Sequence, residues 1–565
     1  MSVDIVAENA LSSTYNLNDM FPGSMQGDIS VAGFARQISV NVGEQIDFSV
    51  TGGSTSIQIF RVGYYSDAKG FRRVATIANT PVNQPELVSI PNSAGATTAT
   101  DWSVTASWPV PSTAVSGIYM AMIRNATNSD AFYATFIVRD DAATADIIYK
   151  TSDSTWGAAY NHYGTKANPD GKNVYGSGTG VGSITQRCFA TSYHRPVITR
   201  GSVSQTYWWA CELPLIRFLE RNGYSVKYIT SVDLDKQGVS ILQKGKIFIS
   251  SGHDEYWTAP MREAVETYRD GYAGRSIFMS GNEVFWKARY EHKSNGESIM
   301  WCYKDTMPGP DGFTRASGTP LDPVEWTGTW MDTRWPDHRD GALLTGTKFG
   351  MNGVYDYDAV IPQNPYGGHK VWGGSNLVDQ PVTMLRALGF EADHIFPTQP
   401  EVSAKILAAY TRSAPGGLAD ANGELYNVPG NIEWGIVSQR YAGGGLTVGF
   451  GTCQWAWTLD GQHDRGIGEL GTNIDAQKFT VNLLRDMGAD PGTLMSGITL
   501  QAKNSLDEYG LDPGGSSSTE EGWYNNAQEQ IFPYTLIDGT LVPLFDVDEE
   551  PVPAGRYTAV YHAKY

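Results

Sequence analysis

Residues 246–286, KIFISSGHDEYWTAPMREAVETYRDGYAGRSIFMSGNEVFW, decide the fold class of this 565-residue chain. The stretch opens with a short apolar run, KIFIS, and closes on a second, SIFMS, and the residues between them have the composition of a helix. Short apolar strands that alternate with helices are typical of a parallel α/β sheet. We therefore predict a strand, a helix and a strand of such a sheet.

The same alternation continues on both sides of this stretch. Residues 146–152 and 226–231 are predicted strands, and residues 206–224 between them have apolar side chains at helical spacing before an Asn-Gly stop. A hairpin turning on residues 443–445 and a helix over residues 475–489 follow further on. The pattern predicts an α/β domain with a mostly parallel sheet at residues 141–490.

The regions around this domain have different patterns. Residues 30–138 form short alternating bursts separated by turn residues, which predicts an antiparallel, immunoglobulin-like β-sandwich over residues 1–140. Residues 305–430 are rich in Gly and Pro, and we predict long loops or a lid there. Residues 491–565 are predicted to be an acidic linker and a C-terminal β segment.

Composition excludes several classes of function. The formal net charge of −19 argues against nucleic acid as a partner, because phosphates require a basic surface. No stretch approaches the length of a membrane span, and the mean hydropathy is −0.30. The opening residues lack the pattern of a secretory signal, so we expect a cytoplasmic protein, with secretion by another route left open. Four scattered cysteines are expected to be buried thiols.

Polar residues gather where three predicted strands end. Ligands of parallel sheets bind beyond the carboxyl ends of the strands, where SGHDEYW (251–257), SGNEVFW (280–286) and TSDSTWGAAYNHYG (151–164) lie. We expect these segments to meet at one place. Within them Asp254 is predicted to be a helix cap. A nucleophilic Cys453 stays an alternative, although no histidine adjoins it in sequence.

The order of motifs resembles the large subunit of N,N-dimethylformamidase and its relatives. The likeness begins at FRVGYYSDAKGFRRV and WPVPSTAVSGIYMAMI, continues through the three strand-end segments and ends at GGGLTVGFGTCQWAWTL, so that it covers residues 30–490. The resemblance implies a β-sandwich followed by a glutamine-amidotransferase-like α/β domain. It also implies hydrolysis of an amide or formamide C–N bond by water that a mononuclear Fe³⁺ activates.

The resemblance also implies roles for individual residues. It makes Glu255 the carboxylate ligand of the iron and Tyr160 one phenolate ligand. Tyr175 is the choice for the other phenolate, with Tyr163 as its competitor. His253 is expected to be a base beside the metal, Asn282 an amide that orients the substrate, and Glu433 a further active-site carboxylate.

Basic chemistry agrees with this ligand set. Hard anionic oxygen ligands select a hard cation such as Fe³⁺, and a metal can keep tyrosine ionised although its free pKa is about 10. The resemblance further implies a small amide as substrate and a separate small subunit as a partner, and we expect a homo-oligomer. The alternative function is a non-catalytic carbohydrate-binding, surface-binding or structural role on the same fold, because a fold alone does not fix function.

Overall fold

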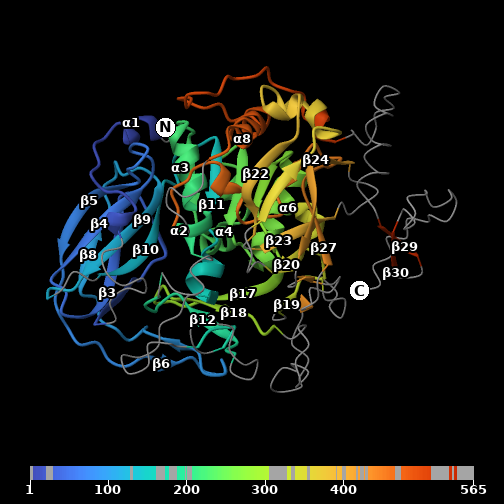
Figure 1. Ribbon diagram of the computed structural model, residues 1–565. Helices are drawn as coiled ribbons and strands as arrows, with labels where there is room; N and C mark the ends of the chain where they lie inside the picture. The colour runs from blue at the N-terminus through green and yellow to red at the C-terminus, as the bar shows by residue number, and fades with distance from the viewer. Residues whose placement is uncertain are drawn as a thin grey trace.

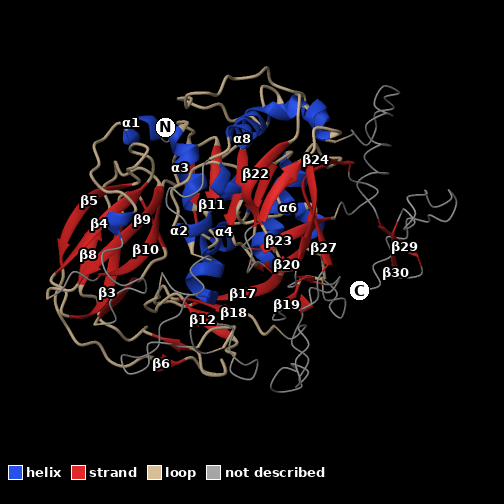
Figure 2. Cartoon of the chain, in the orientation of Figure 1, coloured by secondary structure: helices blue, strands red, loops and turns tan. Residues whose placement is uncertain are grey.

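The computed structural model describes most of the chain outside several loops and the C-terminal region. The described residues are 4–20, 30–127, 131–160, 172–176, 187–197, 199, 207–304, 327–331, 338–352, 357–389, 391–396, 403–414, 418–419, 425–426, 430–464, 472–510, 534–537 and 540–543. Figures 1 and 2 show a β-rich N-terminal unit beside a larger unit that combines helices and strands. The chain is thus a multidomain protein of mixed α and β structure, as predicted.

The N-terminal unit consists of two packed sheets. One sheet is antiparallel in the order β1-β3-β8, and the other has the order β2-β10-β9-β4-β5, in which only the β2–β10 pair is parallel. The strand bounds are β1 (Val31–Ala35), β2 (Ser39–Asn41), β3 (Gln45–Gly52), β4 (Ser56–Val62), β5 (Phe71–Ala78), β8 (Ala106–Pro109), β9 (Gly117–Arg124) and β10 (Ala131–Arg139). Apolar residues between the two sheets, such as Phe48, Ile59 and Phe136, form the sandwich core.

The second face of the larger sheet packs against the α/β unit, which explains why β9 and β10 are apolar along almost their whole length. Met120 and Tyr133 join the same apolar cluster as Trp208 and Trp209 of helix α2 (Trp208–Cys211). At this junction the Arg61 guanidinium contacts the Glu220 carboxylate at 2.8 and 3.0 Å, and both side chains are fully buried. The two units are therefore joined by a continuous core.

A seven-stranded sheet lies at the centre of the α/β unit, in the order β13-β11-β14-β16-β28-β27-β24. Its first five strands are parallel, and β27 and β24 are antiparallel additions at one edge. The strand bounds are β11 (Ile147–Lys150), β13 (Val226–Ile229), β14 (Ile247–Gly252), β16 (Arg275–Ser280), β24 (Ser403–Ala414), β27 (Gly430–Arg440) and β28 (Leu446–Gly449). The predicted, mostly parallel sheet is confirmed.

Helices cover both faces of this sheet (Figure 2). Alternation along each strand sends Ile148, Phe248 and Phe278 to one face, where they pack with residues of α4, α5, α6 and α7. The neighbouring residues Tyr149 and Ile249 face α2, α3 and α8. The helix bounds are α3 (Leu213–Arg221), α4 (Ser231–Gln237), α5 (Val239–Leu242), α6 (Ala259–Tyr272), α7 (Ala342–Thr345) and α8 (Ile474–Asp486), and α1 (Ile5–Asn9) lies near the N-terminus.

The described part of residues 305–430 contains several strands, so the prediction of long loops was wrong there. Two small sheets have the orders β23-β20-β25-β26 and β21-β22, while β24 joins the central sheet. The strand bounds are β20 (Thr347–Asn352), β21 (Tyr357–Ile361), β22 (Val382–Leu388), β23 (Glu391–Ile395), β25 (Leu418–Ala419) and β26 (Leu425–Tyr426). Strands this short, set among Gly and Pro, carry too few alternating positions to stand out in sequence.

A third small sheet, in the order β12-β18-β17-β15 with β19 beside β17, follows the carboxyl ends of the central strands β14 and β16. The bounds are β12 (Ala190–Ser192), β15 (Tyr256–Thr258), β17 (Trp286–His292), β18 (Ser298–Trp301) and β19 (Gly328–Thr329), with a two-stranded pair β6 (Val88–Ser89) and β7 (Thr97–Thr98) in the sandwich unit. Because β15 and β17 directly follow the residues at the ends of β14 and β16, this sheet fixes the positions of both segments.

The described residues 491–510, which were predicted to be part of the linker, pack against the α/β unit. Leu494, Leu506 and Tyr509 pack against the core of the α/β unit, and the Tyr509 hydroxyl donates to the Asp486 carboxylate at 2.7 Å. Apolar side chains at these positions outweigh the acidic composition around them. A hairpin of β29 (Tyr534–Ile537) and β30 (Thr540–Pro543) is described further on, whereas the predicted closing strand at residues 555–565 lies outside the described residues.

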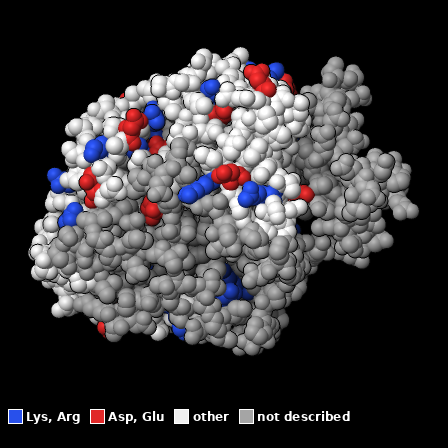
Figure 3. Space-filling view, viewed as in Figure 1, with Lys and Arg blue, Asp and Glu red and all other residues white. Residues whose placement is uncertain are grey.

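Side chains of opposite charge are interspersed on the described surface visible in Figure 3. Among the described residues, the ion pairs Lys370–Glu508 and Lys503–Asp490 join side chains that are at least partly exposed. None of the helices in the described part of the chain combines the length and the apolar character that a bilayer crossing requires.

Candidate functional site

Three parallel strands bring the predicted segments together. β11 pairs with β14, which in turn pairs with β16, and the registers place Lys150 opposite Ser250 and Gly252 opposite Ser280. The segments that follow these strands therefore leave the same edge of the sheet. A direct contact confirms the convergence, because the Glu255 backbone N–H donates to the Thr155 hydroxyl at 3.1 Å.

Glu255 lies at the centre of the resulting polar cluster and is only 3% exposed. Its carboxylate accepts hydrogen bonds from the Tyr175 hydroxyl, at 2.9 Å to Oε2 and 3.1 Å to Oε1. The indole N–H of Trp286 donates to Oε1 at 2.8 Å, and Asn282 Nδ2 donates to the same atom at 3.2 Å. These donors hold the carboxylate in one orientation.

His253 shares its Nε2 atom between two carboxylates. Nε2 lies 2.9 Å from Oε2 of Glu391, on β23, and 3.8 Å from Oε2 of Glu255. Burial would lower the pKa of His253, but the Coulombic attraction and hydrogen bond of Glu391, with the nearby charge of Glu255, outweigh burial and raise this pKa. The ring is therefore suited to hold a proton between the two carboxyl groups.

Asn282 is positioned by its backbone. Its φ of 51° is in the left-handed region, and its N–H donates to Asp393 Oδ1 at 2.7 Å. The preceding residue is Gly281, where a Cβ atom would lie 2.1 Å from the Glu391 carbonyl oxygen, so the close approach of β23 requires glycine. The Asn282 Oδ1 atom is buried and has no hydrogen-bond partner among the described residues. A ligand or water in the site would have a free acceptor there.

Tyr175 has two further close neighbours. The Tyr256 hydroxyl donates to the Tyr175 oxygen at 2.6 Å. The Lys304 Nζ atom lies 3.3 Å from the centroid of the Tyr175 ring and 4.6 Å from that of Trp286. Burial lowers the pKa of Lys304 to about 7, although the charge of Glu255 opposes this shift.

We use the name Glu255 site for the residues that make these contacts. They are Tyr175, His253, Glu255, Tyr256, Asn282, Trp286, Lys304 and Glu391.

The remaining predicted residues are Tyr160, Tyr163 and Glu433. Tyr160 is the last residue of the π-helical turn Ser154–Tyr160, and its side chain lies outside the description, as does Tyr163 altogether. Glu433 is on β27, where its backbone N–H donates to His394 Nδ1 at 3.2 Å. Among the described residues, no hydrogen bond or ion pair joins the Glu433 side chain to the Glu255 site. The carboxylate that contacts His253 is Glu391.

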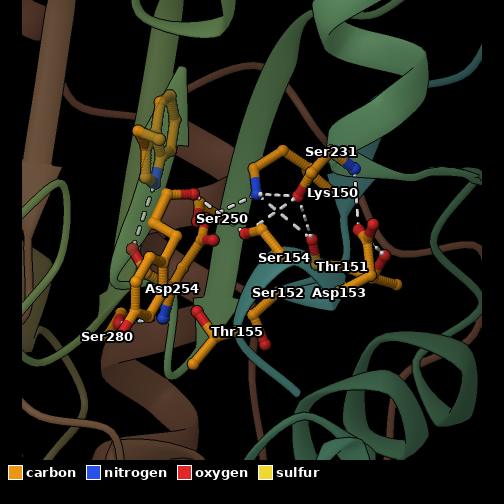
Figure 4. Close-up of polar contacts among 12 residues, drawn as sticks. Lys150, Thr151, Ser152, Asp153, Ser154, Thr155, Ser231, Ser250, Asp254 and Ser280 are labelled. Carbon is orange, nitrogen blue, oxygen red and sulfur yellow. Dashed lines mark hydrogen bonds and ion pairs between the residues drawn. The ribbon is translucent and has the colours of Figure 1, made fainter. Parts of the chain in front are cut away.

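A buried ion pair lies below the site (Figure 4). The Lys150 Nζ atom is 2.6 Å from Asp254 Oδ2, and neither side chain is exposed. Nζ also donates to the Ser231 hydroxyl at 3.2 Å, and the Ser250 hydroxyl donates to the same Asp254 oxygen. Asp254 therefore ties the SGHDEYW segment to the end of β11.

The prediction that Asp254 caps the following helix was wrong. Thr258 is the N-cap of α6, and its hydroxyl accepts from the Met261 N–H at 3.3 Å. A fully buried carboxylate is costly unless a cation compensates it, and Lys150 supplies that cation. A cap near the surface needs no such partner.

Cys453 has the environment of a structural thiol. Its sulfur accepts from the Gly281 N–H at 3.3 Å and donates to the Gly281 carbonyl at 3.6 Å, and burial raises the thiol pKa well above its usual range. All four cysteines are buried thiols outside disulfide bonds, as predicted. Because the thiolate is the nucleophilic form, this environment does not favour the cysteine alternative.

A second buried carboxyl group, Glu212, supports the segment after β11. Its Oε1 atom accepts from the Ser152 hydroxyl at 2.7 Å and from the Trp156 indole at 2.6 Å. Burial raises the pKa of Glu212 to about 8, against the hydrogen bonds that lower it. Between pH 4.5 and 8 the folded state therefore retains a proton that the unfolded state has lost.

This difference in protonation makes a pH-dependent prediction. Where the folded state binds more protons than the unfolded state, the free energy of unfolding decreases as the pH rises. The stability that the protonated Glu212 contributes is therefore lost between pH 4.5 and 8. The Glu212→Gln variant keeps an acceptor for Ser152 and Trp156 and has no charge to bury. We expect it to unfold like the wild type near pH 4.5 and to be more stable by about 2–4 kcal/mol at pH 8.

Urea unfolding at pH 5, 6.5 and 8 measures this difference. Glu263→Gln, at an exposed position of α6, is the control and should change the free energy of unfolding by less than about 0.5 kcal/mol at each pH. A Glu212→Gln variant less stable than the wild type at pH 8 would contradict the prediction.

The oxygen atoms of Tyr175 and Glu255 are of the kind that a hard metal ion prefers as ligands. In the metal-free protein they are joined by a hydrogen bond of 2.9 Å. Among the described residues, no group of three His, Cys, Asp or Glu side chains is arranged to hold a metal. A cation here would therefore depend on tyrosine oxygen.

Four residues of this region were not identified from the sequence. Lys150 carried one signal, a charge at the end of an otherwise apolar strand, and Trp286 lies within a segment already singled out. Lys304 and Glu391 follow no motif. Glu391 is 138 positions from His253 in a Gly- and Pro-rich region, so only the tertiary structure shows the contact.

One protein family matches most of this chain, and two curated relatives match a shorter segment of it. The family described as N,N-dimethylformamidase beta subunit-like, C-terminal, matches residues 56–467. The N,N-dimethylformamidase beta subunits of Paracoccus aminophilus and an Alcaligenes species are 33% and 34% identical over 121 residues, which is 20% of this chain and 16% of each relative.

A solved family 123 glycoside hydrolase from Clostridium perfringens, aligned over 52% of this chain and 53% of its own, has 9% identity and a TM-score of 0.09, too low to bear on the fold. The family match covers the sandwich strands from β4 onward and every described residue of the Glu255 site. The chain belongs to the N,N-dimethylformamidase beta subunit-like family.

Proposed function

We propose that this protein is an iron-dependent amidohydrolase that cleaves the C–N bond of a small amide or formamide. The observation that carries the proposal is the partly buried contact of Tyr175 with Glu255 at 2.9 Å, beside the hydrogen bond between His253 and Glu391. The two relatives named above are subunits of a dimethylformamidase, which supports amide chemistry. Glu255 and Tyr175 would hold the metal, with Tyr160 as the third proposed ligand.

When bound, a ferric ion supplies a Lewis acid that polarises an amide carbonyl and activates water. The side chains of this chain do the remaining work. Asn282 presents its free Oδ1 atom as an acceptor for a water or an amide N–H, and this orients the reacting group. Burial of His253, Asn282 and Glu255 keeps other water away from them.

His253 is the proposed proton carrier. In the form of the ring whose Nε2 atom carries no proton, Nε2 can take the proton released when water attacks the carbonyl carbon and pass it to the nitrogen of the departing amine. Glu391, 2.9 Å away, stabilises the protonated ring during this transfer. The products are a carboxylic acid and an amine, and the active-site proton is returned.

The proposal also includes the assembly of the protein and the type of its α/β domain. Because the relatives are named beta subunits, we propose that this chain acts in an oligomer with a separate small subunit. The glutamine-amidotransferase-like character of the α/β domain is proposed from the parallel sheet with helices on both faces.

Elemental analysis and a visible spectrum of the purified protein test the proposal. We expect about one iron per chain, a phenolate-to-iron absorption band, and release of an amine from dimethylformamide or another small amide. Tyr175→Phe should fail to retain the iron and should therefore lose both the band and the hydrolysis. Tyr509→Phe is the control, since Tyr509 also donates to a carboxylate but lies outside the Glu255 site.

Two results would defeat the proposal. One is protein that stays free of iron and colour after reconstitution, which would favour the binding or structural alternative. The other is amide hydrolysis that survives both iron removal and the Tyr175→Phe substitution.

A further inference from the structure

Tyr175 and Glu255 are held by donors that come from the neighbouring strands β15 and β17. Trp286, the first residue of β17, donates to Glu255. Tyr256, the first residue of β15, donates to Tyr175 at 2.6 Å, the shorter of the two contacts. Because β15 and β17 pair with Tyr256 opposite Trp286, the two donors are fixed side by side on one small sheet.

We propose that Tyr256 is a positioning residue that tunes the electron donation of Tyr175 to the metal. This inference rests on the proposed function, in which Tyr175 is a phenolate ligand. A hydrogen bond donated to a phenolate oxygen withdraws electron density from it and fixes the direction of its lone pairs. Outer partners of this kind orient metal ligands and set their basicity.

The direction of the hydrogen bond follows from the neighbours of Tyr175. The Tyr175 hydroxyl donates to Glu255, so its oxygen is left to accept from Tyr256. If a metal replaces the Tyr175 proton, the oxygen loses its only hydrogen to donate and the contact with Tyr256 can exist only with Tyr256 as donor. The same hydrogen bond therefore persists in both states.

Packing makes Tyr256 rigid enough for this role. Its ring is fully buried in the cluster that contains Phe285, Trp286 and Met300. The adjacent residue Glu255 is the proposed carboxylate ligand. Two consecutive residues therefore supply one ligand and the hydrogen-bond donor to Tyr175, the proposed phenolate ligand. A displacement of β15 would change both together.

Tyr256→Phe tests the proposal, since it removes only the hydroxyl and leaves the ring packing in place. We expect the variant to keep an iron–phenolate band that is moved to longer wavelength, because the phenolate becomes a better electron donor. We also expect the Kd for iron to rise by about 10-fold or more, the usual cost of losing an outer partner.

The matched control is Tyr290→Phe. Tyr290 is a half-buried tyrosine of β17 whose hydroxyl lies 2.9 Å from the Tyr193 hydroxyl, so the control also removes a partly buried tyrosine–tyrosine hydrogen bond. Tyr290 is not one of the residues of the Glu255 site, and its replacement should leave the band and the Kd for iron unchanged. A purely structural role of Tyr256 would make the two variants behave alike.

A measurement on the wild type keeps the proposal testable if Tyr256→Phe fails to fold. Resonance Raman spectra of the phenolate in H₂O and D₂O should differ, because the donated proton is exchangeable. An identical spectrum in the two solvents, or a Tyr256→Phe band at the wild-type wavelength, overturns this inference and leaves the amidohydrolase proposal standing. A wild type without iron, or a band that Tyr175→Phe leaves unchanged, overturns both.

Discussion

Replacing Lys150 with methionine is expected to lower the free energy of unfolding by about 3–5 kcal/mol, the usual cost of breaking a buried ion pair on one side. Lys150 and Asp254 are fully buried and 2.6 Å apart, so the substitution leaves the Asp254 carboxylate without its cation. Methionine preserves most of the aliphatic volume, which limits the cost of an empty space. Urea unfolding measured by circular dichroism checks the value.

Two further variants separate the charge from the packing. Asp254→Asn in the Lys150→Met background removes the stranded charge and should recover more than half of the lost stability, as a double-mutant cycle would show. Lys227→Met on the neighbouring strand β13 is the matched control. Lys227 is a buried lysine bonded to the Ala143 carbonyl, and its loss should cost about 1 kcal/mol. A Lys150→Met variant within 1 kcal/mol of the wild type would show that the pair does not stabilise the fold.

The ion pair shows which features a sequence of this kind reveals. The strands around Lys150 and Asp254 were predictable because a short apolar run and a helical period are local patterns. The partner of Asp254 was not, because it depends on how two strands 100 residues apart come together in the sheet. The local preference of Asp for a helix cap pointed to a different role, and the tertiary contact decided against it.

The same division applies to the Glu255 site. Glu255, His253 and Asn282 were predictable because each follows an apolar strand, and parallel strands place their carboxyl ends at one edge. Glu391 was not predictable, because β23 has five residues and lies in a region with little periodicity. Glu433 was chosen on resemblance alone, and the structure places it on β27, beside His394.

Replacing Glu255 with glutamine is expected to separate folding from activity. The variant retains an oxygen for the Trp286 and Asn282 donors, so the positions of these residues should not change. It removes the negative charge that a hard cation requires. We expect loss of iron and of the phenolate band. Amide hydrolysis should fall by more than about 100-fold, because loss of a residue that only supports a metal ligand already costs up to that factor and Glu255 is proposed as a ligand itself.

The stability of this variant should change in the opposite sense. Glu255 and Glu391 are two buried carboxyl groups on either side of His253, so removing one charge from the metal-free protein relieves repulsion between them. We expect metal-free Glu255→Gln to unfold at the same or a higher urea concentration than metal-free wild type. Sites that bind a ligand commonly retain such unfavourable charge, because the ligand compensates it.

Glu297→Gln is the control for both measurements. Glu297 is another buried glutamate, and its carboxylate accepts from the Thr98 and Ser192 hydroxyls at 2.6 Å each, outside the Glu255 site. It should keep iron and activity. If Glu255→Gln also retained iron and turnover, Glu255 would not be a ligand, and its many donors would have to be explained as a structural hydrogen-bond network. If it lost activity together with its fold, the expected separation would be contradicted, since the carboxylate would then stabilise the protein rather than bind the metal.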